Sequence, residues 1–363
     1  MERFSDLGAA NPSSSHAEGR AAREALESAR ATILGALGAE DFELVFTSGG
    51  TEADNLAVVS AVLEHRHRGV GVLASAVEHP AVLNTEPFLE RLGAHLTIVG
   101  VDADGRLDVD LLRDSFDDST AIVSVLPGNN ETGVLQPTSA VSDACRAHGV
   151  LFLADAVQCV GTLSLELRDA LFDLVTISAH KVEGPRGVGA LLVRRGVTLH
   201  PSLRGGAQEG GRRAGTENVV GAVGFAEAVR LAVKESAVEM PRRARLRDHL
   251  RSEMLRRFPG ARANTPVEAA LPHILNVSFP GVEGESLVRL LDHLGVAAST
   301  GSACNVGSGK LSHVLRAMGR SDAEIRGSLR ISFGRQNDDA QAETFLERLG
   351  EAVGQLQRVS GVG

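Results

Sequence analysis

Short apolar runs alternate with segments of helical hydrophobic spacing along most of the chain. Apolar residues recur at helical intervals over 17–37, and a second helix is expected over 51–66. Ser15 and Glu18 predict that a capping box starts the first helix. The apolar runs are typical of buried strands and span 42–46, 71–75, 96–101, 121–126, 150–155, 174–178 and 190–193. This alternation predicts an α/β fold with a mostly parallel central sheet covered by helices on both faces.

The pattern changes near residue 235. An arginine-rich helical segment over 242–258 leads to an apolar run at 274–279 and a shorter α/β pattern. We therefore expect a large domain over 15–234 and a smaller C-terminal α/β domain over 235–363, with residues 1–14 associated with the smaller one. The arginines are expected to form a solvated helix face, and a docking surface for an acidic partner is the alternative.

Composition narrows the class of protein. With 363 residues, 43% apolar and 23% charged, the chain has the make-up of a globular protein, and no apolar run is long enough to span a membrane. A net charge of -9 argues against direct nucleic-acid binding. The first residues lack the basic and apolar regions of a signal peptide, so a cytoplasmic location is expected. The 3 cysteines are widely spaced and indicate neither a disulfide framework nor a metal site.

The most informative motif is Ser178-Ala179-His180-Lys181, which follows the run at 174–177 and precedes a glycine-rich turn. A lysine at the end of a buried strand can hold a carbonyl cofactor as a Schiff base. A lysine that merely extends to solvent is the alternative.

Polar groups also follow other predicted strands. The glycine turn at 47–55 opens a helix, where backbone N–H groups could bind a phosphate or simply form an ordinary capped turn. Asp155, with Gln158 three residues on, could keep a pyridine nitrogen protonated, or it could cap a helix. His79 could stack on a flat ring, since the chain has no tyrosine or tryptophan, and shuttle protons as a catalytic residue. The alternatives for His79 are a helix cap and a satisfied core residue.

Three further features point to chemistry. The loop at 205–218 is rich in glycine and arginine, which favours either approach to an anion or a flexible linker. Cys304 lies in a small polar loop and is the candidate reactive thiol; the alternative is a loop thiol with no reactive role. Cys145 and Cys159 are expected in the core. Arg330 interrupts an apolar strand and needs an anion, either a substrate carboxylate or an internal acid.

Taken together and in order, these motifs resemble those of cysteine desulfurases, which belong to the class V aminotransferase group of fold-type I pyridoxal-phosphate (PLP) enzymes. The resemblance runs from about Asn11 to Gly334 and rests on residues 47–55, 78–79, 129–133, 155–158, 178–181, 213–218, 301–304 and the strand around 330. It implies conversion of L-cysteine to L-alanine, with sulfur passed to an enzyme persulfide and on to an acceptor protein. Iron–sulfur cluster biogenesis is the expected use of the sulfur, and thiolated tRNA, DNA phosphorothioation and a thio-metabolite stay open as alternatives.

The resemblance also implies how PLP is held. Lys181 would form the Schiff base, His79 would stack on the ring, Asp155 would pair with the pyridine nitrogen and Gln158 would bond the ring hydroxyl. The phosphate would be held by Gly50, Thr51, Ser178 and His180.

The remaining roles concern the substrate and the neighbouring subunit. Thr216 would reach the phosphate of the partner in a homodimer. Asn130 would lie against the cofactor and, with Arg330, bind the substrate carboxylate, while Cys304 would attack the sulfur. The loop from Cys304 to Ser312 resembles the longer loop of the subgroup that includes the iron–sulfur and nitrogenase-maturation enzymes.

The chain departs from the family pattern in three places. Asn11 arrives almost at once, and only 7–10 remains of a usual N-terminal segment, so part of the substrate entrance is expected to be missing or rebuilt. Pro127-Gly128 replaces a histidine and a small apolar residue, and Glu183 replaces an aromatic residue. Two alternatives therefore stay open: a PLP-dependent C–S or selenocysteine lyase, and a weakly active scaffold or sulfur-relay homologue.

Overall fold

The computed structural model describes residues 10–65, 70–163, 165, 167, 171–301 and 311–360. The chain divides into two compact units. The first comprises residues up to 99, 109–127 and 137–236, and the second comprises 100–108, 128–136 and the chain from 237 onward. Each unit has its own hydrophobic core.

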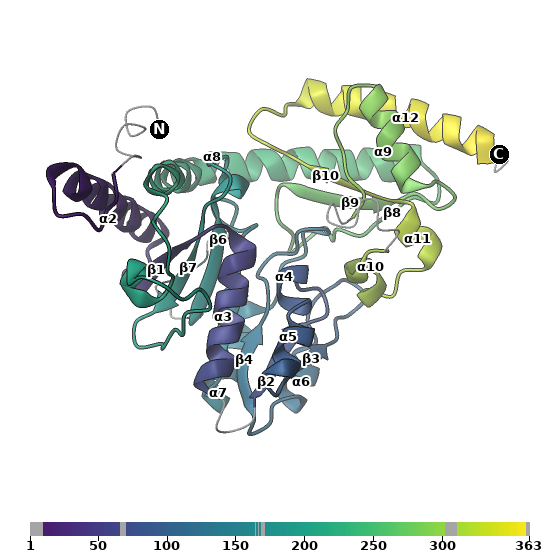
Figure 1. Ribbon diagram of the computed structural model, residues 1–363. Coiled ribbons are helices and arrows are strands. Elements are labelled where there is room, and N and C mark those ends of the chain that lie inside the picture. Colours follow the sequence, from purple (N-terminus) through teal and green to yellow (C-terminus); the bar gives the residue numbers. More distant parts are fainter. Residues whose placement is uncertain are drawn as a thin grey trace. The chain divides into compact units, whose positions relative to one another are not determined.

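The first unit is built on a sheet whose described strands run in the order β1-β7-β6-β5-β4-β2-β3 (Figure 1). Only β7 runs antiparallel to its neighbours, so the predicted mostly parallel sheet is confirmed. Parallel strands end at one edge, which gathers the loops that follow β1, β2, β4, β5 and β6. The strands are β1 Phe42–Thr47, β2 Val70–Ser75, β3 Ala94–Val99, β4 Thr120–Ser124, β5 Leu151–Asp155, β6 Leu174–Ser178 and β7 Gly189–Arg194.

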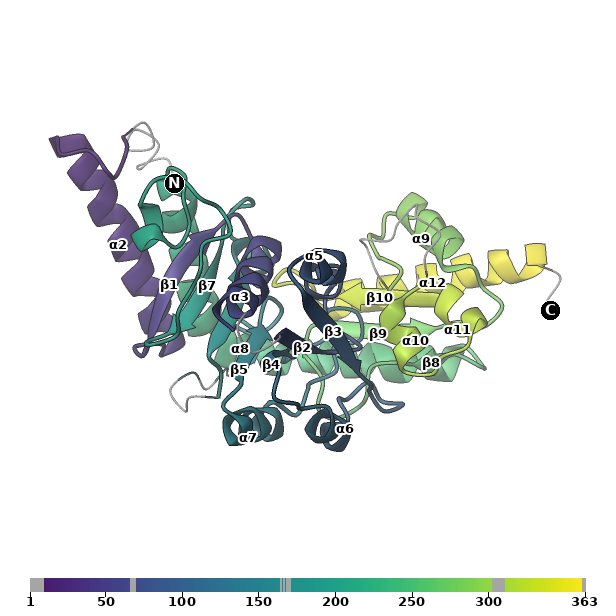
Figure 2. The same cartoon turned by 60° about the horizontal axis from the view of Figure 1, so that its bottom comes forward.

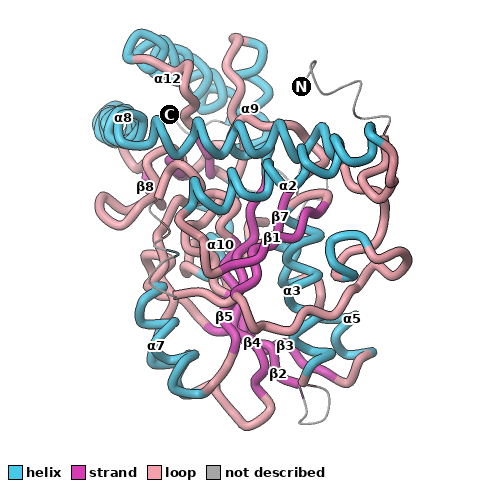
Figure 3. The backbone as a smooth tube through the Cα atoms, turned by 90° about the vertical axis from the view of Figure 1, so that its left-hand side faces the viewer, coloured by secondary structure: helices cyan, strands magenta, loops and turns pink. Residues whose placement is uncertain are grey.

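Helices cover both faces of this sheet. α3 lies against one face and α7 against the opposite face (Figure 2, Figure 3). α3 is apolar almost all round because it is buried between the sheet and its neighbours, with Leu56 and Val62 nearly inaccessible to solvent. The helices are α2 Ala17–Leu37, α3 Gly50–Glu64, α4 Pro80–Leu83, α5 Glu86–Arg91, α6 Val109–Asp114, α7 Thr138–His148 and the start of α8 Val219–Arg257.

The start of α2 corrects one prediction. The N-cap is His16, whose Nδ1 accepts the N–H of Gly19 at 3.2 Å, so Ser15 does not form the expected capping box. Glu18 contacts the His16 ring instead. The helix ends as expected at Gly38, which adopts the left-handed conformation with φ 63°.

The second unit is a small antiparallel sheet with helices, in the order β10-β9-β8. Leucines of α8, α9 and α12 pack on it, among them Leu250, Leu287 and Leu349. Two early segments complete the unit: Val134 bridges Ala270, and residues 100–108 are tied to 128–136. Its elements are β8 Arg262–Ala263, β9 Ile274–Ser278, α9 Gly284–His293, α10 His313–Ala317, α11 Asp322–Arg326, β10 Ser328–Ser332 and α12 Asp339–Ser360.

The arginines of α8 only partly form the expected solvated face. Arg245 and Arg256 are exposed, but Arg247 is only 5% exposed and donates to the carbonyls of Ala270 and Leu271. Arg242 bonds Glu239 and the carbonyl of Gly334. The prediction is wrong for Arg247, because its guanidinium satisfies backbone groups that burial would otherwise leave unpaired.

Candidate active site

The polar residues predicted from strand ends converge at the carboxyl edge of the first unit's sheet. Thr51 follows β1, His79 follows β2, Asp155 ends β5 and Lys181 follows β6. Gln158 lies one turn beyond Asp155, where the turn begins with Val157 N–H donating to the Asp155 carboxylate at 3.0 Å.

None of the described helices is both long and apolar enough to cross a membrane.

The turn that opens α3 has the properties of a phosphate cradle. Its N-cap is Gly49, which has no side chain to bind the first-turn amides, so those N–H groups are available to an anion. The backbone is packed too closely for larger residues: a Cβ on Gly50 would lie 2.8 Å from the Val157 side chain, and one on Gly189 would lie 2.7 Å from Gly49 Cα. The Ser178 hydroxyl lies beside this turn and 2.9 Å from His180 Nδ1.

Three buried carboxyl groups, those of Asp54, Glu78 and Asp155, interact electrostatically in the first unit. Side-chain ligand atoms of Asp54, His79 and Asp155 all lie within 4.8 Å of one another. Burial raises the pKa of Asp155, while the positive charges of His79 and Lys181 oppose the rise. Burial and the charge of Asp155 raise the pKa of Asp54 well above its usual value, and burial raises the pKa of Glu78 to about 8.

This electrostatic setting fits a protonated pyridine ring at Asp155. A buried carboxylate without enough nearby positive charge is stabilised by a bound cation. The distances among Asp54, His79 and Asp155 would also suit a metal ion. The amine of Lys181 and the cradle at Gly50 favour PLP, which needs a lysine, an anion site and a carboxylate together.

Lys181 follows the strand β6, as the sequence predicts. It belongs to a single 3-10 turn, η4 Ala179–Val182, and is exposed in the described chain rather than buried at a strand end. Its charge lowers the pKa values of both His180, after the larger effect of burial, and Asp155. The amine is therefore within electrostatic reach of the proposed ring-binding carboxylate.

The loop at 205–218 is anchored, so a free linker is excluded for it. Arg213 Nε donates to Glu52 Oε1 at 2.7 Å, and Glu52 also accepts the N–H of Ser48 at 2.8 Å. The loop is thus tied to the first turn of α3, next to the phosphate cradle. Thr216 follows shortly after and is exposed.

The second unit brings Asn130 and Arg330 together. Arg330 extends from β10, is half-buried, and donates from Nη1 to the carbonyls of Asn130 at 3.1 Å and Gly301 at 3.3 Å. Glu131, which sequence reasoning missed, is buried and accepts the Ser312 hydroxyl at 2.5 Å.

The expectation that Cys145 and Cys159 lie in the core is confirmed. Cys145 and Cys159 are buried, and burial raises the pKa of Cys145 to about 12 and that of Cys159 further. Both are therefore poor nucleophiles. Cys304 lies outside the described residues, as do residues 1–9, on which the comparison of the N-terminus rests.

Comparison with known proteins defines the family. The Aminotransferase class-V family model matches residues 1–345. A cysteine desulfurase of Gluconacetobacter diazotrophicus is 44% identical over 352 residues, covering 96% of this chain and 88% of that one. A solved NifS-like protein is similar with a TM-score of 0.91 at 33% identity, covering 98% of this chain and 94% of that one. The solved structure of SspA in complex with cysteine gives 0.79 at 31% identity, covering 92% and 93%. The chain belongs to the class-V aminotransferase family of PLP enzymes and, within it, to the cysteine desulfurases.

Proposed function

We propose that the chain is a PLP-dependent cysteine desulfurase whose cofactor site is formed by Lys181, His79 and Asp155. The observation that carries the proposal is the convergence of these side chains on one sheet edge, beside the uncapped start of α3. The identity to a named cysteine desulfurase supports the same reaction.

Within this proposal each residue of the first unit has one task. PLP, when bound, supplies an electron-accepting ring that makes bonds to the substrate α-carbon easier to break. Asp155 keeps a negative charge at the ring nitrogen, and His79 covers one ring face. Lys181 would hold the cofactor through Nζ and would take up the α-proton of the substrate at the same atom. Gln158 bonds the ring hydroxyl, and the phosphate is held by Gly50, Thr51, Ser178 and His180.

The second unit supplies the substrate contacts and the thiol. Arg330, with Asn130, binds the carboxylate of L-cysteine, since a guanidinium matches two carboxylate oxygens. The Cys304 thiolate attacks the substrate sulfur, so an S–S bond forms and the C–S bond breaks. The electron pair of the broken bond takes up a proton at the β-carbon, and the α-proton held on Lys181 Nζ returns to the α-carbon, which yields L-alanine and an enzyme persulfide. A sulfur-acceptor protein then removes the outer sulfur, with iron–sulfur cluster assembly as the proposed use.

The proposal includes a homodimer, in which Thr216 contacts the phosphate bound by the neighbouring subunit, and a cytoplasmic location. The exposure of Thr216 on an anchored loop supports the first. Light scattering of the purified chain and fractionation of cells that express it would test the two statements.

The decisive experiment compares the wild type with Lys181→Ala and Cys304→Ala. The wild type should be yellow, lose its colour on borohydride reduction and form alanine from cysteine. Lys181→Ala should lose the wild-type absorbance, whereas Cys304→Ala should keep it and fail to transfer sulfur. Pyruvate as the product would instead support a lyase, and a colourless wild type would support a scaffold.

A further inference from the structure

We propose that Glu209 is a positioning residue that, together with Arg30, fixes the loop at 205–218 to the edge of the sheet and so presents Thr216 for PLP binding. The inference rests on the proposed function, because it assigns Thr216 to the cofactor phosphate.

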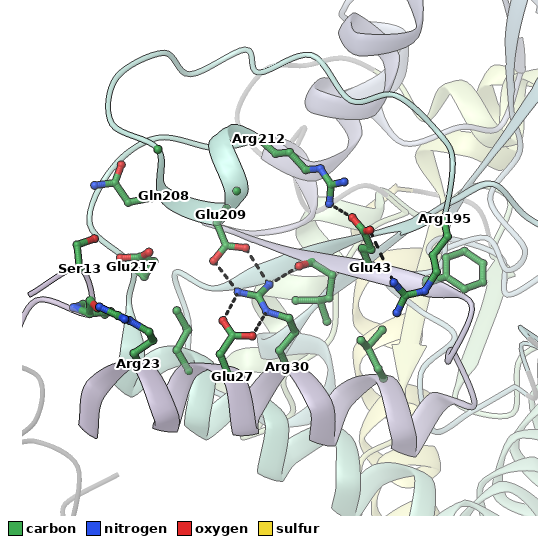
Figure 4. Close-up of a pocket in the computed structure, with 17 residues that line it drawn as sticks. Ser13, Arg23, Glu27, Arg30, Glu43, Arg195, Gln208, Glu209, Arg212 and Glu217 are labelled. Atoms are coloured by element: carbon green, nitrogen blue, oxygen red, sulfur yellow. Dashed lines mark hydrogen bonds and ion pairs between the residues drawn. The ribbon is translucent and has the colours of Figure 1, made fainter. Parts of the chain in front are cut away.

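Glu209 is a buried acid with several donors. Its side chain is 2% exposed. Oε2 accepts Nη1 of Arg30 at 2.9 Å and Oε1 accepts Nη2 of Arg30 at 3.1 Å (Figure 4). Oε2 also accepts the backbone N–H of Phe46 at 2.9 Å. The carboxylate is therefore bound bidentately by a guanidinium and also bonded to β1, so its position is defined by two different elements.

The Arg30–Glu209 pair bonds to backbone groups of the edge strand β1. β1 ends the order of described strands in the sheet, so its outward backbone groups lack a strand partner on that side. Glu209 satisfies the N–H of Phe46, and Arg30 donates to the carbonyl of Leu44 and lies 5.0 Å over the Phe46 ring. Residues 44 and 46 point the same way along a strand. The Arg30–Glu209 pair thus does what a neighbouring strand would otherwise do, and the loop is docked on β1 through side chains.

The backbone of the loop indicates that this contact is enforced. Glu209 adopts φ 50° and ψ 38°, and Gly210 and Gly211 follow with φ 65° and 80°. The left-handed region is unfavourable for a residue with a side chain, and it is retained only where surrounding contacts hold it. Glycine would fit the backbone here, so the glutamate is explained by its side chain.

A second anchor transmits the position of Glu209 along the loop. Gln208 Oε1 accepts the N–H of Gly215 at 3.1 Å, which joins the two ends of the loop, and Arg213 is paired with Glu52 on α3. Thr216 directly follows the residue that Gln208 holds. Loss of the Glu209 contact should therefore free the segment that leads to Thr216.

The test uses a matched pair of variants on the same guanidinium. Glu209→Gln removes the buried charge, whereas Glu27→Gln removes an acid that also bonds Arg30, at 3.1 Å, but is 58% exposed. Hydrogen exchange of peptides covering 205–218 should become faster in Glu209→Gln and stay unchanged in Glu27→Gln. PLP titrated into the apoprotein should bind Glu209→Gln about tenfold more weakly, as expected for loss of a charged hydrogen bond.

A double-variant cycle tells positioning from general damage. If Glu209 acts through Thr216, then Glu209→Gln should have little further effect on the PLP dissociation constant in a Thr216→Ala background. An equal effect in both backgrounds, or unchanged exchange of the loop, would overturn the inference. Arg30→Lys, which keeps the charge but cannot donate two parallel bonds, should change exchange and PLP affinity in the same direction if Glu209→Gln does not fold. A wild type that binds no PLP would overturn the proposed function and the Thr216 step together, while the exchange comparison still tests the docking contact alone.

Discussion

Asp54 and Asp155 bring side-chain oxygens within 4.8 Å of each other in a buried part of the first unit. Two carboxylates this close in a buried environment repel each other strongly if both are charged, so one of them is expected to be protonated. Since the pKa of Asp54 is raised well above its usual value, partly by the charge of Asp155, we assign the proton to Asp54 and the charge to Asp155. A neutral Asp54 therefore lies beside a charged Asp155, the residue that we propose to pair with the cofactor ring.

This division predicts opposite outcomes for two similar substitutions. Asp54→Asn imitates a neutral acid, and the Thr176 hydroxyl, which interacts with Asp54, can accept from the new amide. PLP affinity and turnover should stay within about threefold of the wild type. Asp155→Asn should lower turnover by about a hundredfold or more, since it removes the charge at the ring nitrogen. Absorbance titration and alanine formation measure both, and equal losses in the two variants would refute the assignment.

Glu78 predicts how stability changes with pH. Its folded pKa of about 8 lies above the ordinary value of 4.5, so the folded state holds a proton that the unfolded chain has lost. The contribution of this proton to the free energy of unfolding is fully present below about pH 4.5. It is lost as the pH rises to about 8, which lowers the free energy of unfolding by an amount on the order of 5 kcal/mol. In Glu78→Gln the amide oxygen still accepts from Leu126 N–H and the amide nitrogen can donate to the Ser124 hydroxyl, so this variant should flatten the decline.

The measurement for Glu78 is the urea unfolding midpoint of the PLP-free protein at about pH 5 and pH 8. The exposed Glu90→Gln on α5 serves as the control and should keep the wild-type difference between the two midpoints. A Glu78→Gln protein with the same pH dependence as the wild type would show that Glu78 is already ionised when folded.

The strands were predictable because parallel strands buried on both faces are continuous apolar runs. β6 coincides with its predicted run, and the polar residues after β2, β5 and β6 follow directly from where those runs end. The site edge could therefore be derived from sequence. The exposure of Lys181 could not, because it depends on the 3-10 turn that separates it from the strand.

Features of the fold and the site that depend on contacts between residues far apart in the sequence could not be predicted. The segments at 100–108 and 128–136 belong to the second unit through contacts such as the Val134–Ala270 bridge, and no local sequence pattern predicts these contacts. Asp54 and Glu131 were missed for the same reason. One signal was present for Asp54: over residues 53–62 the only other polar residues are Asn55 and Ser60, and a charged residue in so apolar a stretch is rarely on the surface.

Arg330 should govern substrate affinity more than cofactor binding. Arg330→Lys keeps a positive charge but loses the planar fork, and Nη1 would no longer bond the carbonyls of Asn130 and Gly301. We expect the KM for cysteine to rise by about ten- to a hundredfold, with PLP absorbance unchanged. Arg316→Lys, on the exposed ion pair with Asp322, is the matched control and should leave KM unaltered. A rise in KM shared by both variants would point to a general effect of charge.

Gly189 should be as important to the phosphate cradle as the residues that line it. An added Cβ would lie 2.7 Å from Gly49 Cα and 2.8 Å from the Ile177 carbonyl, both of them backbone atoms that can move only if β6 or the cradle moves. Gly189→Ala should therefore displace the Gly49 turn and weaken PLP binding by about tenfold or more. Gly35→Ala, in the interior of α2 with nothing within 4 Å of the new methyl group, should leave PLP affinity unchanged and stabilise the chain by up to about 1 kcal/mol. Titration of the two apoproteins with PLP, together with their urea unfolding midpoints, distinguishes a displaced cradle from a general loss of stability, because only the former weakens binding in a protein that remains folded.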